Sequence, residues 1–190
     1  MFKTFRPSPP PPHMCVPRPL VIDADHGLIR GGQGRLRHPD PQRLELNRSA
    51  LELLRLWLRF RGRVLLLSSL PQDWALWLSE TLGIPGAVQA VGRRAGDRAE
   101  DAVRRFGMRG FEFLGGPETI AVLGAGAARL WLLGDPGTLQ AQMRTLGVPL
   151  IVLDTGDAVA LRDLAGRGAG GWPLDRPRSD GAREQRGLGP

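Results

Sequence analysis

The sequence predicts an α/β protein in which a mainly parallel sheet carries helices on both faces. Short apolar runs alternate along the chain with longer segments in which apolar residues recur at helical spacing. This alternation is typical of βαβ units, because parallel strands need a crossover element between them. The chain has 190 residues, 42% of them hydrophobic and 24% charged, which suits one domain with a substantial core.

The predicted strands are the short apolar runs, several of which end in Gly, Ser or Asp. In chain order they are Leu20–Ile22, Val64–Leu67, Ala87–Val91, Phe111–Leu114, Arg129–Leu133 and Leu150–Leu153.

The predicted helices fill the intervals between these strands. They are Ser49–Phe60, Pro71–Gly83, Asp97–Phe106, a segment that begins at Pro117, and Thr138–Leu146. The first has a polar stripe opposite apolar residues, and Ser49 with Glu52 predicts a capping box at its start. Proline favours the first turn of a helix and glycine favours its end, so Pro71 and Gly83 set the limits of the second helix.

The two ends of the chain do not suit a packed core. Residues 1–18 include the proline run PSPPPPH, which favours extended polyproline II structure and excludes a core helix. Residues 161–190 are rich in Gly, Arg and Pro. We expect both ends to be disordered, which leaves 19–160 as the predicted folded domain.

Charge and cysteine content exclude several classes of protein. The formal net charge is +7, but most of the excess lies in the two ends, so we expect no nucleic-acid partner. No apolar run approaches the roughly 20 residues of a membrane span, and residues 1–18 lack the apolar region of a secretory signal. Cys15 is the only cysteine, which excludes an internal disulfide, and the cytoplasm is the expected location.

Two carboxylates follow the first predicted strand, in the stretch PLVIDADHGLI. Asp23 and Asp25 lie where the strand ends, and Gly27 allows the chain to turn there. Ligands of open α/β sheets bind in the crevice at the carboxyl ends of the strands, so both acids are expected to face it. A lone D-x-D is also typical of a capped turn, and the stretches that follow favour the site.

These stretches resemble a known family. LVIDADHGLI resembles the D-x-D-G-T-L signature of the haloacid dehalogenase (HAD) superfamily of phosphohydrolases, and the strand that ends at Ser68 resembles its second motif. The later stretches RRFGMRGFEFLGG, ARLWLLGDP and LGVPLIVLD resemble the HAD domain that is fused to prenyltransferases of the ubiquinone-biosynthesis type. The resemblance covers about 19–154 and implies a Rossmann-like HAD fold.

The resemblance implies a phosphohydrolase that forms an aspartyl-phosphate intermediate from a phosphomonoester. Asp23 would attack phosphorus, while Asp25 would protonate the leaving group and then activate water. Ser68 would hydrogen-bond the transferring phosphoryl group, and Arg94 would neutralise its charge. Mg²⁺ would be held by Asp23, Asp25 and Glu118.

The implied site departs from the family pattern at three places. His26 and Gly27 replace the usual Gly-Thr, which removes a side chain that contacts phosphate. Arg94 replaces a lysine, which keeps the charge without the geometry of a compact ammonium group. Gly116 replaces the metal-binding Asp that follows the fourth strand, so Glu118 is the substitute ligand.

Further departures concern the second acid and the cap. Thr119 or Ile120 stands where the family has its second acid after the fourth strand. We expect no sizeable cap domain, because a normal crossover helix takes up much of the short segment between the acid pair and Ser68.

Two hypotheses about function remain open. In the first, the protein is a Mg²⁺-dependent HAD-type phosphohydrolase of reduced activity, acting on a phosphorylated small molecule or a lipid-linked phosphate. In the second, it is a catalytically degenerate HAD domain that binds a protein partner or a phosphorylated ligand, as a binding or regulatory module. A receiver-like domain is a weaker alternative, because no lysine follows Lys3.

Overall fold

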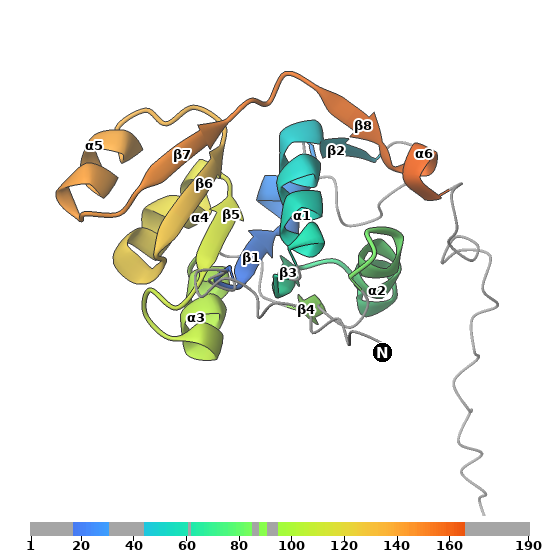
Figure 1. Ribbon diagram of the computed structural model, residues 1–190, viewed down its shortest axis with the longest axis horizontal. Coiled ribbons are helices and arrows are strands. Elements are labelled where there is room, and N and C mark those ends of the chain that lie inside the picture. Colours follow the sequence, from blue (N-terminus) through green and yellow to red (C-terminus); the bar gives the residue numbers. More distant parts are fainter. Residues whose placement is uncertain (1–16, 31–43, 61, 85–87, 91–94, 166–190) are drawn as a thin grey trace, which may run out of the picture.

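Six strands form one parallel sheet, in the order β4-β3-β1-β5-β6-β7 (Figure 1). They are β1 (Leu20–Asp23), β3 (Val64–Ser68), β4 (Val88–Ala90), β5 (Glu112–Gly115), β6 (Arg129–Leu133) and β7 (Leu150–Leu153). The structure is a computed structural model that describes residues 17–30, 44–60, 62–84, 88–90 and 95–165. Most of the predicted leader and tail lies outside these residues. The predicted α/β class and parallel sheet are confirmed.

Helices cover both faces of the sheet, as predicted. They are α1 (Arg48–Arg59), α2 (Gln72–Thr81), α3 (Ala95–Phe106), α4 (Pro117–Leu123) and α5 (Leu139–Thr145), with a short 3₁₀ turn, η3 (Gly124–Gly126). Side chains alternate between the faces along a strand, so Leu20 and Ile22 pack with α1 and α2, whereas Val21 packs with α3, α4 and α5. The result is one apolar layer on each face of the sheet, with β1 fully buried between the two layers.

The strand order creates a switch point beside β1. The chain runs from β1 to β3 and β4 on one side, and β5 then lies on the other side of β1. Crossovers that leave in opposite directions open a crevice at the carboxyl ends of the two central strands, where ligands of such folds bind. The acid pair therefore follows the strand whose end borders this crevice.

A second, two-stranded sheet extends the domain beyond its predicted limit at residue 160. β2 (Glu45–Asn47) pairs antiparallel with β8 (Ala158–Ala160), and the short helix α6 (Leu161–Ala165) follows directly. Leu161 is fully buried, and its N–H donates to the carbonyl of Leu44 at 2.9 Å. Leu161 therefore belongs to the core, one residue beyond the predicted limit.

The start of α1 differs from the predicted capping box. Asn47 is the N-cap residue, and its side chain donates to the carbonyl of Gly27 at 3.1 Å instead of capping the helix. Ser49 lies inside the first turn, and its hydroxyl donates to the carbonyl of Asp154 at 2.8 Å. The capping-box prediction was wrong because both polar side chains bind distant segments of the chain.

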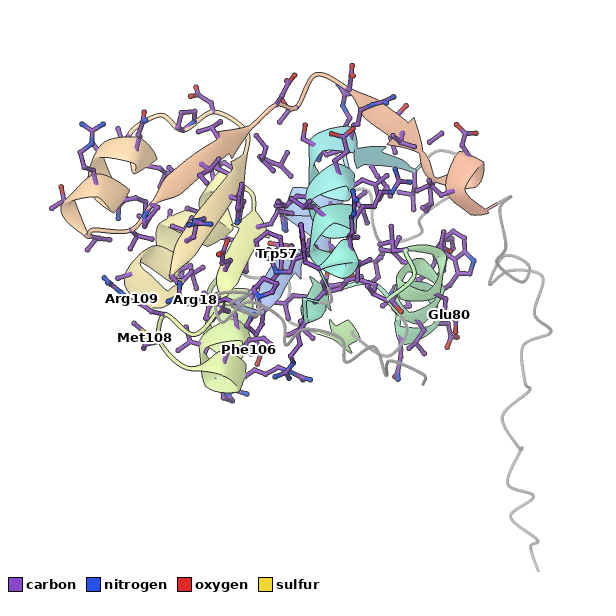
Figure 2. All side chains as sticks on the ribbon, in the orientation of Figure 1. Arg18, Trp57, Glu80, Phe106, Met108 and Arg109 are labelled. Carbon is purple, nitrogen blue, oxygen red and sulfur yellow. The ribbon has the colours of Figure 1, made fainter. Side chains whose placement is uncertain are left out.

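Trp57 of α1 and Trp74 and Trp77 of α2 belong to the core. Trp57 of α1 packs edge-on against Trp131 of β6, with ring centroids 6.1 Å apart. Its Nε1 donates to the carbonyl of Arg18 at 2.9 Å, and Figure 2 labels Trp57 and Arg18. Trp74 and Trp77 of α2 are 9% and 3% exposed. These contacts fix both helices on the face of the sheet that packs with α1 and α2.

Candidate functional site

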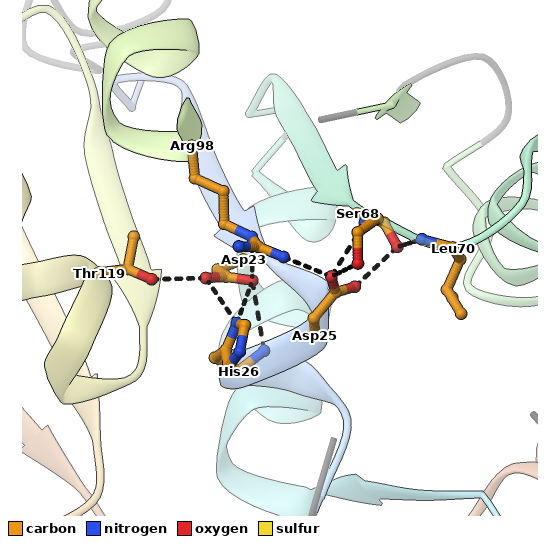
Figure 3. A network of polar contacts seen from close by, with 8 residues as sticks. Asp23, Asp25, His26, Ser68, Leu70, Arg98 and Thr119 are labelled. Atoms are coloured by element: carbon orange, nitrogen blue, oxygen red, sulfur yellow. Dashed lines mark hydrogen bonds and ion pairs between the residues drawn. The ribbon is translucent and has the colours of Figure 1, made fainter. Parts of the chain in front are cut away.

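Asp23 and Asp25 lie together at the carboxyl end of β1, beside the switch point. Asp23 is the last residue of β1, and the chain then forms one turn of π-helix, η1 (Ala24–Leu28). Asp25 lies in this turn, and both acids belong to one buried network (Figure 3). The turn approaches β5 closely at Gly27, where an added Cβ would lie 3.0 Å from the Cα of Gly115.

Both oxygens of the Asp23 carboxylate are engaged by protein groups. The hydroxyl of Thr119 on α4 donates to Oδ2 at 2.8 Å, and the backbone N–H of His26 donates to Oδ1 at 3.2 Å. Nδ1 of His26 lies 3.3 Å from Oδ2, and Nε of Arg98 lies 3.2 Å from Oδ1. Asp23 is 0% exposed, so these groups replace its hydration shell.

Asp25 is held by a second set of donors. The hydroxyl of Ser68, at the end of β3, donates to Oδ1 at 2.8 Å. The N–H and the hydroxyl of Ser69 donate to Oδ2 at 2.9 Å and 2.6 Å, and Nη2 of Arg98 donates to the same oxygen at 2.6 Å. Burial alone would raise the pKa of Asp25, but the hydrogen bonds from Ser69, Ser68 and Arg98 outweigh it and hold this pKa below its usual value.

Arg98 joins the two carboxylates. Its side chain is 1% exposed and forms ion pairs with both Asp23 and Asp25 from the first turns of α3. A buried guanidinium needs such partners, because an uncompensated charge in the interior is costly. The positive charge between the acids is therefore supplied by the chain itself.

Sequence reasoning missed Arg98 and selected Arg94, which lies outside the described residues. A signal for Arg98 was present in the pattern of α3. Arg98 lies on the helix face that also carries Ala99 and Ala102, which are 6% and 0% exposed. A charged residue on the apolar face of a helix indicates a buried partner, and the acid pair supplies it.

His26 completes the charge balance of the network. The hydrogen bond to Asp23 raises the pKa of His26, against the opposing effect of burial and of the Arg98 charge. When His26 is protonated, the two carboxylates face two cations, Arg98 and His26. The family pattern has glycine at this position, so the imidazole is a departure from it.

The residues of the network do not fit a Mg²⁺ centre. Mg²⁺ needs an octahedral set of oxygens with at least one carboxylate free to bind it. In the described part of the chain, no group of three or more His, Cys, Asp or Glu side chains is placed to hold a metal ion. Asp23 and Asp25 are already bridged by Arg98, and Glu118, the predicted third ligand, is exposed on the first turn of α4.

The backbone closes the position at which the resemblance implies a metal-binding acid. Gly116 is the N-cap of α4, and an added Cβ there would lie 2.9 Å from the carbonyl oxygen of His26. An aspartate at 116 therefore requires η1 to move. Asp135, which follows β6, does not replace it, because its side chain is exposed and accepts from the N–H of Gly137 at 2.9 Å.

A crevice of about 340 Å³ lies above the network. Its polar lining includes Asp25, His26, Arg30, Asn47 and Glu118. The guanidinium of Arg30 also reaches the carbonyl of Gly156 at 3.4 Å, so the crevice spans from η1 to the connection before β8. This cavity is large enough for a small polar ligand that contacts the network from outside.

The structure thus brings Asp23, Asp25 and Ser68 together, and adds Ser69, Arg98, His26 and Thr119 to them. Comparison with protein-family models, curated proteins and solved structures found no match to this chain.

No helix among the described residues is long and apolar enough to cross a membrane.

Proposed function

We propose that this protein is a HAD-like domain that binds a phosphorylated ligand without hydrolysing it. One observation carries the proposal: Arg98, 1% exposed, bridges the two acids on which hydrolysis would depend, at 3.2 Å from Asp23 and 2.6 Å from Asp25. In this proposal the acid pair is a structural ion-pair network, and the crevice above it is the binding site.

The state of each acid supports a domain without turnover. A nucleophilic carboxylate must present an oxygen to phosphorus, but both oxygens of Asp23 contact donors of the chain. A general acid must carry a proton, but the lowered pKa of Asp25 keeps it ionised at neutral pH. Gly116 and Thr119 stand where the resemblance implies acids, and their lack of a carboxylate also supports a domain without turnover.

The lining of the crevice supports an anionic ligand. His26 and Arg30 both line it; the imidazolium of His26 is paired with Asp23, so Arg30 carries the charge that would face the ligand. The charge of Asp25 is balanced by Arg98, which leaves Glu118 as the remaining acid of the lining. A phosphomonoester, free or lipid-linked, has the charge and the acceptor oxygens that these cations and Asn47 would bind.

An assay of hydrolysis tests the first part of the proposal. We expect no Mg²⁺-dependent release of phosphate from p-nitrophenyl phosphate by the wild type beyond that of the Asp23→Asn variant. We also expect no heat of Mg²⁺ binding in calorimetry. Phosphate release that Mg²⁺ raises and Asp23→Asn abolishes would contradict the proposal and support the phosphohydrolase hypothesis.

A titration with inorganic phosphate and with glucose 6-phosphate tests the second part. We expect saturable binding that weakens about tenfold or more in Arg30→Ala, because a charge-assisted contact is lost. Arg104→Ala is the matched control, since Arg104 lies on α3 and pairs with Glu100 at 2.8 Å, away from the crevice. Equal affinity in both variants, or no binding at all, would exclude the crevice as a phosphate site.

The phosphohydrolase hypothesis retains one favourable observation. Asp23, Asp25 and Ser68 lie together at the carboxyl end of the sheet, in the arrangement that the resemblance implies. For hydrolysis Arg98 would have to release both acids.

The cytoplasmic location and a protein partner stay predictions.

A further inference from the structure

The outer edge of β7 has the features of a pairing surface. β7 is the last strand of the sheet, and no other strand of the described residues pairs with it on that side (Figure 1). Its four residues, LIVL, are all apolar. Ile151 and Val152 point to opposite faces and are 36% and 43% exposed, so the described residues leave the edge partly uncovered on both faces.

The backbone of β7 has hydrogen-bonding groups directed outward. The N–H of Leu130 on β6 donates to the carbonyl of Pro149 at 2.9 Å, just before β7 begins. Peptide groups alternate in direction along a strand, so those of Ile151 also face β6, and those of Leu150 and Val152 face away from it. An edge of this kind is a template for another strand.

β7 is short, but its own residues lack the other devices that protect edge strands. Proteins usually guard such edges with lysine, proline, a bulge or a covering element. β7 contains neither a charged residue nor a proline, and it pairs in regular register with β6 from Leu150 to Leu153. Among the described residues, this edge is therefore open to a partner strand.

The charges at the two ends of β7 select the partner. Arg144 and Arg109 are exposed near the start of the strand, where Nη2 of Arg109 donates to the carbonyl of Leu146 at 3.2 Å. Asp154 is exposed directly after the end of the strand. In an antiparallel pair, the acidic end of each copy would lie beside the basic end of the other copy. The edge is therefore complementary in charge to a second copy of itself.

We propose that two copies of this chain pair through β7 around a twofold axis. The two strands would run antiparallel, with Leu150 and Val152 exchanging backbone hydrogen bonds across the axis, and the two sheets would join into one continuous sheet. Ile151 and Val152 of each copy would then be covered by their counterparts. This inference is independent of the proposed ligand in the crevice.

Sedimentation equilibrium over a wide concentration range, without ligand, tests this interface. The wild type is expected to form a dimer of twice the 20.7 kDa chain mass. Val152→Lys should raise the dissociation constant about tenfold or more, because it places an ammonium group against the apolar Leu150 of the other copy and a second ammonium group diagonally across the axis on the same face. Val152→Pro should do the same by removing an outward N–H, while the N–H groups that face β6 are kept.

Val122→Lys is the matched control, since Val122 is 57% exposed on α4, outside the edge. It should dimerise like the wild type, and circular dichroism should show that all three variants are folded. A wild type that is monomeric at every concentration would overturn the proposal. So would a dimer that tolerates both substitutions at Val152.

Discussion

At the scale of single residues, Arg98 is the side chain on which the buried site depends. Asp23 and Asp25 are 0% and 1% exposed, and two adjacent buried anions repel each other unless a cation separates them. Arg98 supplies that cation from a different element. Ser68, Ser69 and Thr119 complete the hydrogen bonds, but they carry no charge.

Replacing Arg98 by methionine should destabilise the protein strongly. The substitution keeps much of the side-chain volume and leaves two buried carboxylates without their cation, which should cost about 3–5 kcal/mol of unfolding free energy. Urea denaturation at neutral pH measures it. Adding Asp25→Asn to this variant should recover part of the loss, because one of the two charges is removed.

The control for this substitution is Arg104→Met on the same helix. The side chain of Arg104 is 67% exposed, so its ion pair with Glu100 should contribute about 0.5 kcal/mol or less. If Arg98→Met lowered the unfolding free energy as little as Arg104→Met, the ion-pair network would not be a main source of stability.

At the scale of elements, η1 and α4 together leave no room for an acidic side chain at position 116, where the HAD pattern would have one. The π-helical turn brings the carbonyl of His26 against Gly116, the N-cap of α4. The same turn directs the N–H of His26 to Asp23. A local backbone shape, and not one missing side chain, separates this site from a metal centre.

Gly116→Asp should therefore destabilise the protein without creating a Mg²⁺ site. The added Cβ would lie 2.9 Å from the carbonyl oxygen of His26, and the shift this requires should cost about 1–3 kcal/mol. Thermal unfolding with and without Mg²⁺ measures both effects. A variant that is stabilised by Mg²⁺ would show that the closed backbone is not the obstacle.

Gly96→Ala on α3 is the comparison for a harmless glycine replacement. A Cβ at Gly96 would meet only a methyl group of Val122, at 4.0 Å. Since alanine is a better helix former than glycine, this variant should be unchanged or more stable by up to about 1 kcal/mol.

At the scale of the whole molecule, the network makes stability depend on pH in a defined way. The pKa of His26 is raised in the folded state above its ordinary value of 6.5. Its contribution to stability is therefore fully present below pH 6.5 and is lost as the pH rises through the folded pKa. The pKa of Asp25 is lowered from 3.8, so its contribution is present above pH 3.8 and is lost as the pH falls through the folded pKa.

The unfolding free energy of wild type minus that of His26→Gln should consequently decrease as the pH rises above 6.5. Urea denaturation between mildly acidic and mildly alkaline pH measures this difference. Glu118→Gln, which removes a carboxylate of the crevice lining, is the control. In this background the difference in unfolding free energy that His26→Gln makes should still decrease as the pH rises. A difference between wild type and His26→Gln that does not change with pH would show that the imidazole does not titrate against Asp23.

Much of this architecture could be predicted from the sequence. Apolar runs such as Leu20–Ile22 and Leu150–Leu153 are confirmed as strands, because local hydrophobicity and period report burial directly. The resemblance implied that Ser68 shares a site with Asp23 and Asp25, and the hydroxyl of Ser68 lies 2.8 Å from Asp25. These properties are local, or follow from strand order.

What the sequence could not reveal depends on contacts between distant segments. β2 and β8 pair across more than half the chain, and neither is long enough to show a clear period. Thr119 and Arg98 reach the acid pair only because α4 and α3 pack over the end of the sheet. No pattern in either helix specifies which strand end it will face.

The sequence by itself therefore determined the α/β class, the parallel sheet and the location of the acid pair, through periodicity and the order of elements. The tertiary structure alone decided the condition of that pair. Helix packing placed Arg98 between Asp23 and Asp25, and η1 closed the space at Gly116. Periodicity records which residues are buried, whereas only three-dimensional packing decides which buried charges meet.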